Sequence, residues 1–204
     1  MRVEPQTARG RATRDRIIQT AAGLVREHGV AATSLELVES TAGVGRSQMY
    51  HYFDGRDDLL RAMATSTANP IIDRATTALA DVHSLADIDT WFASLVTANA
   101  QTGSIGGCPI GSLVAQMAEH DDETRKVFVD IFARWEEPLV SCLRRLQDNG
   151  TLRPDIAVID VAGTIMAAMQ GGLLLAQVRR DPDQLRRALT GARAALNASA
   201  TSCL

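Results

Sequence analysis

The sequence predicts an all-α protein with a small N-terminal helix-turn-helix domain and a larger helical domain behind it. Aromatic residues make up only 4% of the 204 residues, alanine is abundant, and β-branched runs are short and never alternate. Apolar residues instead recur at spacings of three and four, the period of a helix with one buried face. We therefore expect domains at residues 1–55 and 56–204, and 46% apolar residues suffice to fill their cores.

The first predicted helix covers residues 13–28. Its apolar residues, from Ile17 to Val25, fall on one helical face, and Gly29 follows as the expected C-cap. The first 16 residues carry five arginines against two acidic residues, while the whole chain carries a net charge of −3. This local excess favours either a basic arm that contacts phosphates or an unstructured solvated tail, and both readings stay open.

A helix-turn-helix is predicted next. Thr33 or Ser34 is expected to cap a helix that ends near Ala42, and Gly43-Val44 is expected to make the turn. A third helix runs from about Arg46 to Phe53 and carries several hydrogen-bond donors. This order of elements is typical of a reader of the DNA major groove.

The remaining sequence predicts further helices separated by short loops. Asn69-Pro70 is expected to end or kink the fourth helix, Pro138 to kink a long one, and Asp155 to cap the next. The fourth helix is predicted to begin near residue 56. The later helices are predicted at about residues 87–101, 110–119, 122–149, 155–180 and 182–197.

Two C-terminal helices carry more apolar surface than a monomer needs. Gly163, Ala167 and Gly171 recur every four residues and allow close approach of another helix, and a leucine and alanine stripe follows in the last helix. Because a helix-turn-helix usually reads a palindrome as a dimer, we expect a symmetric interface, with ordinary core packing as the alternative. The predicted interface residues are Gly163, Ala167, Gly171, Leu185, Leu189 and Ala192.

The cysteine pattern and the length of the apolar runs indicate the cellular location. Three widely spaced cysteines without a CxxC pair suggest reduced thiols and neither a disulfide framework nor a zinc site. No run approaches 18 uninterrupted apolar residues and the N-terminal segment is not apolar. We expect a cytoplasmic protein with no membrane, metal or cofactor requirement.

One set of residues between Gly29 and about Leu60 forms a recognisable motif. The set is Gly29, Thr33-Ser34-Leu35, Val38, Ala42-Gly43-Val44, Tyr50-His51-Tyr52-Phe53, Arg56 and Leu59. At this spacing the motif resembles the TetR family of bacterial transcriptional regulators. The C-terminal part, through Gly107-Cys108-Pro109 and Gln170-Gly171-Gly172 with the leucines that follow, is also similar to the LmrA/YxaF-like branch.

The resemblance implies a set of DNA-contacting residues. Arginine can donate two hydrogen bonds to guanine, glutamine can pair with adenine, and hydroxyl groups can donate to phosphate. Tyr52 and Phe53 are expected to be core instead, while Glu39 and Gly45 depart from the family pattern. The implied DNA-contacting residues are Thr33, Arg46, Ser47, Gln48, Tyr50, His51 and Arg56.

The resemblance also implies a homodimer that binds a palindromic operator on double-stranded DNA and is released by a small-molecule effector. Aromatic and methionine side chains suit an apolar or planar ligand, although the same residues could simply be core. The predicted lining is Trp91, Phe92, Leu95, Leu113, Met117, Phe128, Phe132, Trp135, Met166 and Gln170.

Two other classes of function compete with a ligand-responsive repressor. An enzyme is disfavoured because the four histidines are scattered and no phosphate-binding glycine loop is present. His120-Asp121-Asp122 is better explained as a helix end followed by a cap than as a metal site. A DNA-binding protein whose C-terminal body only dimerises stays open as the second alternative.

Overall fold

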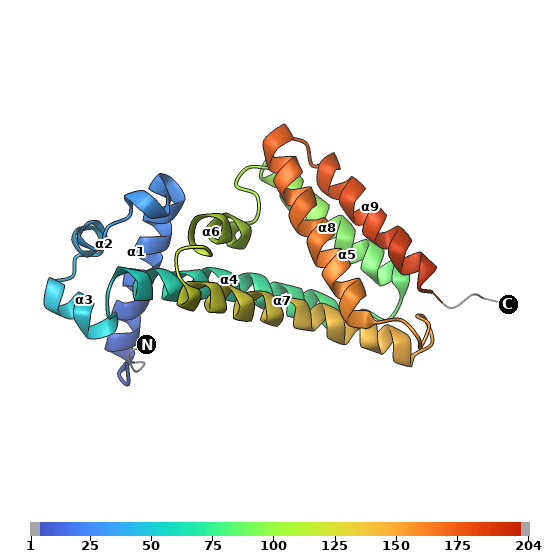
Figure 1. Cartoon of the computed structure of the whole chain (residues 1–204), viewed down its shortest axis with the longest axis horizontal. Coiled ribbons are helices and arrows are strands. Elements are labelled where there is room, and N and C mark those ends of the chain that lie inside the picture. Colours follow the sequence, from blue (N-terminus) through green and yellow to red (C-terminus); the bar gives the residue numbers. More distant parts are fainter. Residues whose placement is uncertain (1–4, 201–204) are drawn as a thin grey trace. The chain divides into compact units, whose positions relative to one another are not determined.

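The computed structural model describes residues 5–200, which form nine helices and no strand (Figure 1). The all-α prediction is confirmed. The helices are α1 (Ala8–Ala32), α2 (Leu35–Ala42), α3 (Arg46–Tyr52), α4 (Arg56–Ala80), α5 (Leu85–Gln101), α6 (Pro109–Met117), α7 (Asp122–Asp148), α8 (Val158–Arg179) and α9 (Asp183–Ala198).

The helices belong to two compact units. The first contains the chain up to Pro70 together with residues 113–131, and the second contains residues 71–112 and the chain from Phe132 onward. The first half of α4 lies in the first unit because Leu59, Leu60 and Met63 are buried there. We therefore place the first domain boundary inside α4, later than the boundary at residue 55 that the sequence suggested.

Helix α1 starts five residues earlier than predicted. The Thr7 hydroxyl accepts a hydrogen bond from the Gly10 amide at 3.0 Å and caps the helix. The arginines from Arg9 onward therefore lie on a helix, while Arg2 lies outside the described residues. Gly29 adopts φ +81°, which breaks the helix as predicted, and one more turn then runs to Ala32.

Two predicted proline sites lie inside helices, and one predicted helix cap differs from the structure. Helix α4 continues through Pro70 and does not end there, and α7 continues through Pro138, so a kink at either proline stays a prediction. Asp155 does not cap α8, which begins after Ala157 without a side-chain cap. The Asp155 carboxylate instead accepts two hydrogen bonds from Arg153 at 2.9 and 2.7 Å, because that guanidinium lies two residues away.

Helices α8 and α9 pack side by side, and α5 also contacts α9 (Figure 1). The closest approach is at Gly172, where an added Cβ would lie 2.9 Å from the Cα of Leu185 and from the Cβ of Ala188. Leu185, Leu189 and Ala192 are almost fully buried inside this unit. Inside the subunit their apolar stripe is covered by the chain itself, so the open side of α8 offers more surface to a partner, and the role of these three residues in a dimer stays a prediction.

Helix α8 also has an exposed apolar face. Ile159, Leu174, Leu175 and Val178 are all exposed, at fractions from 44% to 72%. Among residues 5–200 this helix alone is long and apolar enough to cross a membrane by length and composition. That criterion is weak for a single helix, so the exposed apolar face calls for another explanation.

Candidate nucleic-acid interface

Helices α2 and α3 form the helix-turn-helix that the sequence predicted. Ser34, and not Thr33, caps α2, since its hydroxyl accepts from the Leu37 amide at 3.1 Å. Gly43 ends α2 with φ +63° and ψ +41°, a left-handed conformation that glycine adopts without strain. Buried Val44 follows and fixes the turn against the core.

Helix α3 presents one polar face to solvent. Met49 is fully buried and Phe53 is 1% exposed, so these two side chains anchor the helix at its inner face. Tyr50 and Tyr52 are half-buried. The exposed residues of this face are Arg46, Ser47, Gln48 and His51. All four carry side-chain hydrogen-bond donors, as major-groove readout requires.

Arg46 is held in place by its neighbours on the outer surface. Its guanidinium carbon lies 5.9 Å from the centre of the Tyr50 ring, within cation–π range. A hydrogen bond with Tyr50, followed by the charges of Tyr50 and Glu39, raises the pKa of Arg46 above its ordinary value. Glu39, which departs from the family pattern, therefore has a basic neighbour. Arg46 stays a cation at every pH at which DNA is stable.

Thr33 is not placed for DNA contact in this structure. Thr33 is only 1% exposed, and its hydroxyl donates a hydrogen bond to the Gly29 carbonyl at 2.9 Å. The hydroxyl thus satisfies a carbonyl at the break in α1, and a phosphate cannot reach it there. We leave Thr33 out of the proposed interface.

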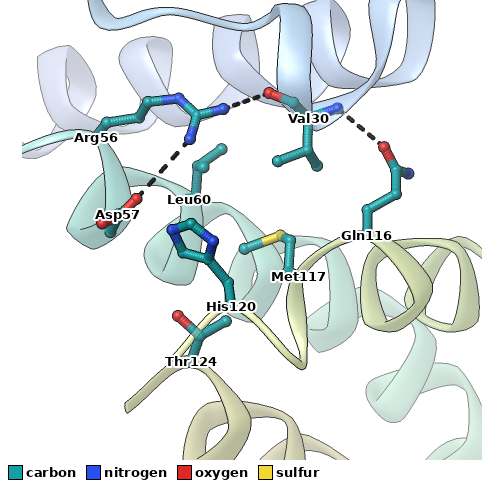
Figure 2. A pocket seen from close by; sticks show the side chains of 8 residues that line it. All are labelled: Val30, Arg56, Asp57, Leu60, Gln116, Met117, His120 and Thr124. Carbon is teal, nitrogen blue, oxygen red and sulfur yellow. Dashed lines mark hydrogen bonds and ion pairs between the residues drawn. The ribbon is translucent and has the colours of Figure 1, made fainter. Parts of the chain in front are cut away.

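Arg56 supports the helix-turn-helix from inside (Figure 2). Its Nε donates to the Thr33 carbonyl at 2.8 Å and its Nη2 donates to the Val30 carbonyl. Its Nη1 lies 3.9 Å from Asp57. The side chain is one-third exposed, so most of its donors are already used within the protein.

The Val30 peptide is held from both sides (Figure 2). Its amide donates to Oε1 of Gln116 in α6 at 2.9 Å, while its carbonyl accepts from Arg56. A cavity of about 40 Å³ lies among these groups. This volume suits one or two water molecules and is far below that of a drug-sized ligand site. The role of Gln116 could not be predicted from sequence, because 86 residues separate it from Val30.

We expect Arg56→Ala to destabilise the first unit by about 1–3 kcal/mol, because two carbonyls that lie mostly away from water would lose their donors. Denaturant unfolding followed by circular dichroism would measure the change. Arg125→Ala is the matched control, since Arg125 is 55% exposed and forms an ion pair with the exposed Asp122 in the same unit. Equal effects of the two substitutions would contradict a supporting role for Arg56.

Arginines of α1 lie beside this interface. The Arg14 guanidinium carbon lies 5.4 Å from the centre of the Phe53 ring, next to the end of α3. Arg11 donates to the Pro5 and Gln6 carbonyls, and Arg9 and Arg16 are exposed. The basic N-terminal segment is therefore a helical surface from Ala8 onward, which favours phosphate contact over an unstructured tail.

The predicted effector lining is divided between the two units. Leu113, Met117 and Phe128 belong to the first unit and the other seven residues to the second. Phe92 lines an open groove of about 520 Å³ between α5 and α9, and Met117 lines the small cavity of Figure 2. Both tryptophans are buried, Trp91 at 8% and Trp135 at 6% exposed, so these rings fill the interior.

Gln170 is the polar residue of the predicted lining. Its side chain hydrogen-bonds Met166 and Cys108, and an added Cβ at Gly111 would lie 3.2 Å from its Oε1. Burial raises the pKa of the Cys108 thiol. Among the residues that the structure describes, no cluster of three His, Cys, Asp or Glu side chains could hold a metal ion.

Comparison with known proteins agrees with this architecture. The family described as "Bacterial regulatory proteins, tetR family" matches residues 17–63, which contain the helix-turn-helix. The family described as "Tetracyclin repressor-like, C-terminal domain" matches residues 84–192, more than half of the chain. The chain belongs to the TetR family. It is therefore a DNA-binding transcriptional regulator and not an enzyme.

Relatives of this TetR-family chain span nearly its whole length. A transcriptional regulator of Mycobacterium tuberculosis is 30% identical over 82% of this chain and 86% of its own. The repressor DhaR of a Mycobacterium species is 23% identical, with coverage of 87% and 88%. YxaF of Bacillus subtilis is 26% identical, with coverage of 88% and 92%, in agreement with the branch that the sequence suggested.

Solved structures show the same fold. A TetR-family regulator from Cytophaga hutchinsonii has a TM-score of 0.82 at 18% identity and covers 98% of this chain and 100% of its own. The reduced form of NemR from Escherichia coli has a TM-score of 0.77 at 22% identity, with coverage of 89% and 95%.

Proposed function

We propose that the chain is a dimeric repressor that binds a palindromic operator and leaves it when a small apolar or aromatic effector binds the second unit. The observation that carries the proposal is the outer face of α3. It exposes Arg46, Ser47, Gln48 and His51 around the buried anchor Met49. Such a rigid helix with outward donors fits a major groove.

The residues of this face divide into two roles. Arg46 and Gln48 can read base edges, since their forked donor and acceptor groups match guanine and adenine. Ser47, Tyr50 and His51 can donate to phosphates, which fixes the position of the helix on the duplex. The Arg56 side chain is one-third exposed, so its outer guanidinium edge can still reach a phosphate. We keep Arg56 as a proposed phosphate contact through that edge.

The dimer is proposed to form through the exposed face of α8. An added Cβ at Gly163 or Gly171 would meet no atom of the described chain within 4 Å, so this face is open to a partner helix. A helix that is apolar on all sides is normally buried on all sides, and a second copy would bury the outer side of α8. This also explains the apolarity of α8 in a cytoplasmic protein without a membrane.

The effector is proposed to bind in the second unit among Trp91, Phe92, Leu95, Phe132, Trp135, Met166 and Gln170. The ring centres of Trp91 and Phe92 lie 5.3 Å apart, and those of Phe132 and Trp135 lie 5.8 Å apart. A planar apolar compound can stack on such rings, and Met166 can repack around it. Gln170 would supply the polar contact that orients the ligand.

Tryptophan emission tests this proposal, because the two tryptophans of the chain, Trp91 and Trp135, both lie in the second unit. We expect an aromatic effector to change the emission and to weaken operator binding in the same titration. Linkage requires that operator DNA weaken effector binding by the same factor, typically about 5–150-fold. Anisotropy of a labelled duplex would be read in the same sample. A compound that saturates the emission change without affecting duplex affinity would contradict effector control by that site.

A further inference from the structure

Exposed large apolar side chains in the second unit are concentrated on α8 and on the loop before α6. Such residues normally occur singly on a protein surface, and a cluster of them marks an interaction site. Among the described residues, six are strongly exposed, and five of these lie on α8 or on the loop before α6. The five are Ile105, Ile159, Leu174, Leu175 and Val178, and the sixth is Val129 in the first unit.

The loop that carries Ile105 is fixed against the C-terminal end of α8. An added Cβ at Gly107 would lie 2.3 Å from Oε1 of Gln177, so the loop contacts the side chain of Gln177 here, and the φ of +58° favours glycine at this position. The Ser104 carbonyl accepts from Arg180 at 3.4 Å, and the buried Ser104 hydroxyl donates to Asn99 at 2.7 Å. Ile105 is therefore held outward at 66% exposure beside the exposed end of α8.

The outer face of α8 is self-complementary. Ile159, Gly163, Ala167, Gly171 and Leu175 follow at four-residue spacing, with small residues at the centre and large ones at both ends. A two-fold axis through Ala167 would place each glycine opposite the other glycine of the partner subunit.

The charges on α8 favour the same arrangement. Asp160 is exposed near the start of the helix and Arg179 near its end. In an antiparallel pair of α8 helices about Ala167, Asp160 and Arg179 of the partner subunit would lie at the same end of the contact, offset by about 7.5 Å along the helix, so opposite charges would meet the same end of each helix.

We propose that the loop of residues 103–107 is a second dimer contact, in which Ile105 packs on the start of the partner subunit's α8, beside Ile159 of the partner subunit. The inference rests on the proposed dimer and adds to it a loop outside the α8 face. Because Pro109 begins α6 directly after this loop, the partner would also brace the start of α6.

Sedimentation equilibrium tests the loop directly. We expect Ile105→Asp to weaken dimerisation roughly tenfold or more, since each dimer would bury two aspartates in place of two apolar side chains. Val129→Asp is the control, because Val129 is similarly exposed at 59% but lies in the first unit. A dimer unaffected by Ile105→Asp would overturn the loop contact and leave the dimer intact. A monomeric wild-type protein would overturn the proposed dimer itself.

Crosslinking tests the direction of the contact. Gly107, two residues after Ile105, lies beside Gln177, and Ile159 lies 18 residues before Gln177, roughly 27 Å along α8 at about 1.5 Å per residue. In a chain with Cys108→Ser, Cys142→Ala and Cys203→Ser, a short bismaleimide should join Ile105→Cys to Ile159→Cys only between subunits. A covalent dimer from the double variant, and none from either single variant, is expected. Crosslinking of Ile105→Cys alone, or no crosslink in a protein that sediments as a dimer, would overturn the contact.

Discussion

Gly171→Leu is expected to turn a dimeric protein into a monomer without unfolding it. An added Cβ at Gly171 would meet no atom of the described chain within 4 Å, so a leucine fits the isolated subunit. Leucine also favours the helix over glycine by roughly 0.5–1 kcal/mol. In the proposed dimer the same leucine would overpack the helix contact by about 1–3 kcal/mol or more. Sedimentation velocity and thermal unfolding of the same sample would separate the two effects.

Gly172→Leu is the matched control at the next position. Its Cβ would lie 2.9 Å from the backbone Cα of Leu185, which cannot rotate away. This variant should therefore be less stable to unfolding, whereas Gly171→Leu should stay folded and only fail to dimerise. A dimeric Gly171→Leu variant would show that α8 does not pair through this face, and a monomeric wild-type protein at micromolar concentration would contradict the dimer.

Loss of sequence preference is expected when Arg46 is replaced by Ala. The guanidinium is exposed on α3 and stays charged, so its removal would leave one base position unread in each half-site. We expect roughly tenfold to hundredfold weaker operator binding and relaxed preference at that position. Anisotropy titrations with the operator and with single-base variants would measure both changes.

Tyr50→Ala separates base reading from phosphate contact. This variant should weaken binding to all duplexes by a similar factor, because a phosphate contact carries no base information. Arg125→Ala, which removes an exposed cation outside α3, should change affinity little beyond a general salt-dependent effect. Unchanged base preference after loss of Arg46 would place the reading surface elsewhere.

The helix-turn-helix could be predicted from sequence because its signals are local. A serine cap, a left-handed glycine and a buried valine lie within eleven residues around α2. Each of these residues needs only its near neighbours in the chain to act. The start of α1 was missed because its cap, Thr7, lies in a polar segment without apolar periodicity.

Which helix covers each apolar face could not be predicted in the same way. A stripe at helical spacing shows that a face is buried but not which helix buries it. Leu185, Leu189 and Ala192 are buried by their own chain, whereas the side of α8 with Gly171 stays open. The contact between Gln116 and Val30 is likewise invisible in sequence, since no periodicity links residues 86 positions apart.

Selection from a random duplex library tests the central claim most directly, that the outer face of α3 reads a palindromic DNA sequence. The wild-type protein should enrich one palindrome with two equivalent half-sites, as a symmetric dimer requires. The double variant Arg46→Ala with Gln48→Ala should lose that preference while keeping salt-dependent binding to unselected DNA. Enrichment of the same palindrome by both proteins, or of none by the wild type, would contradict the account.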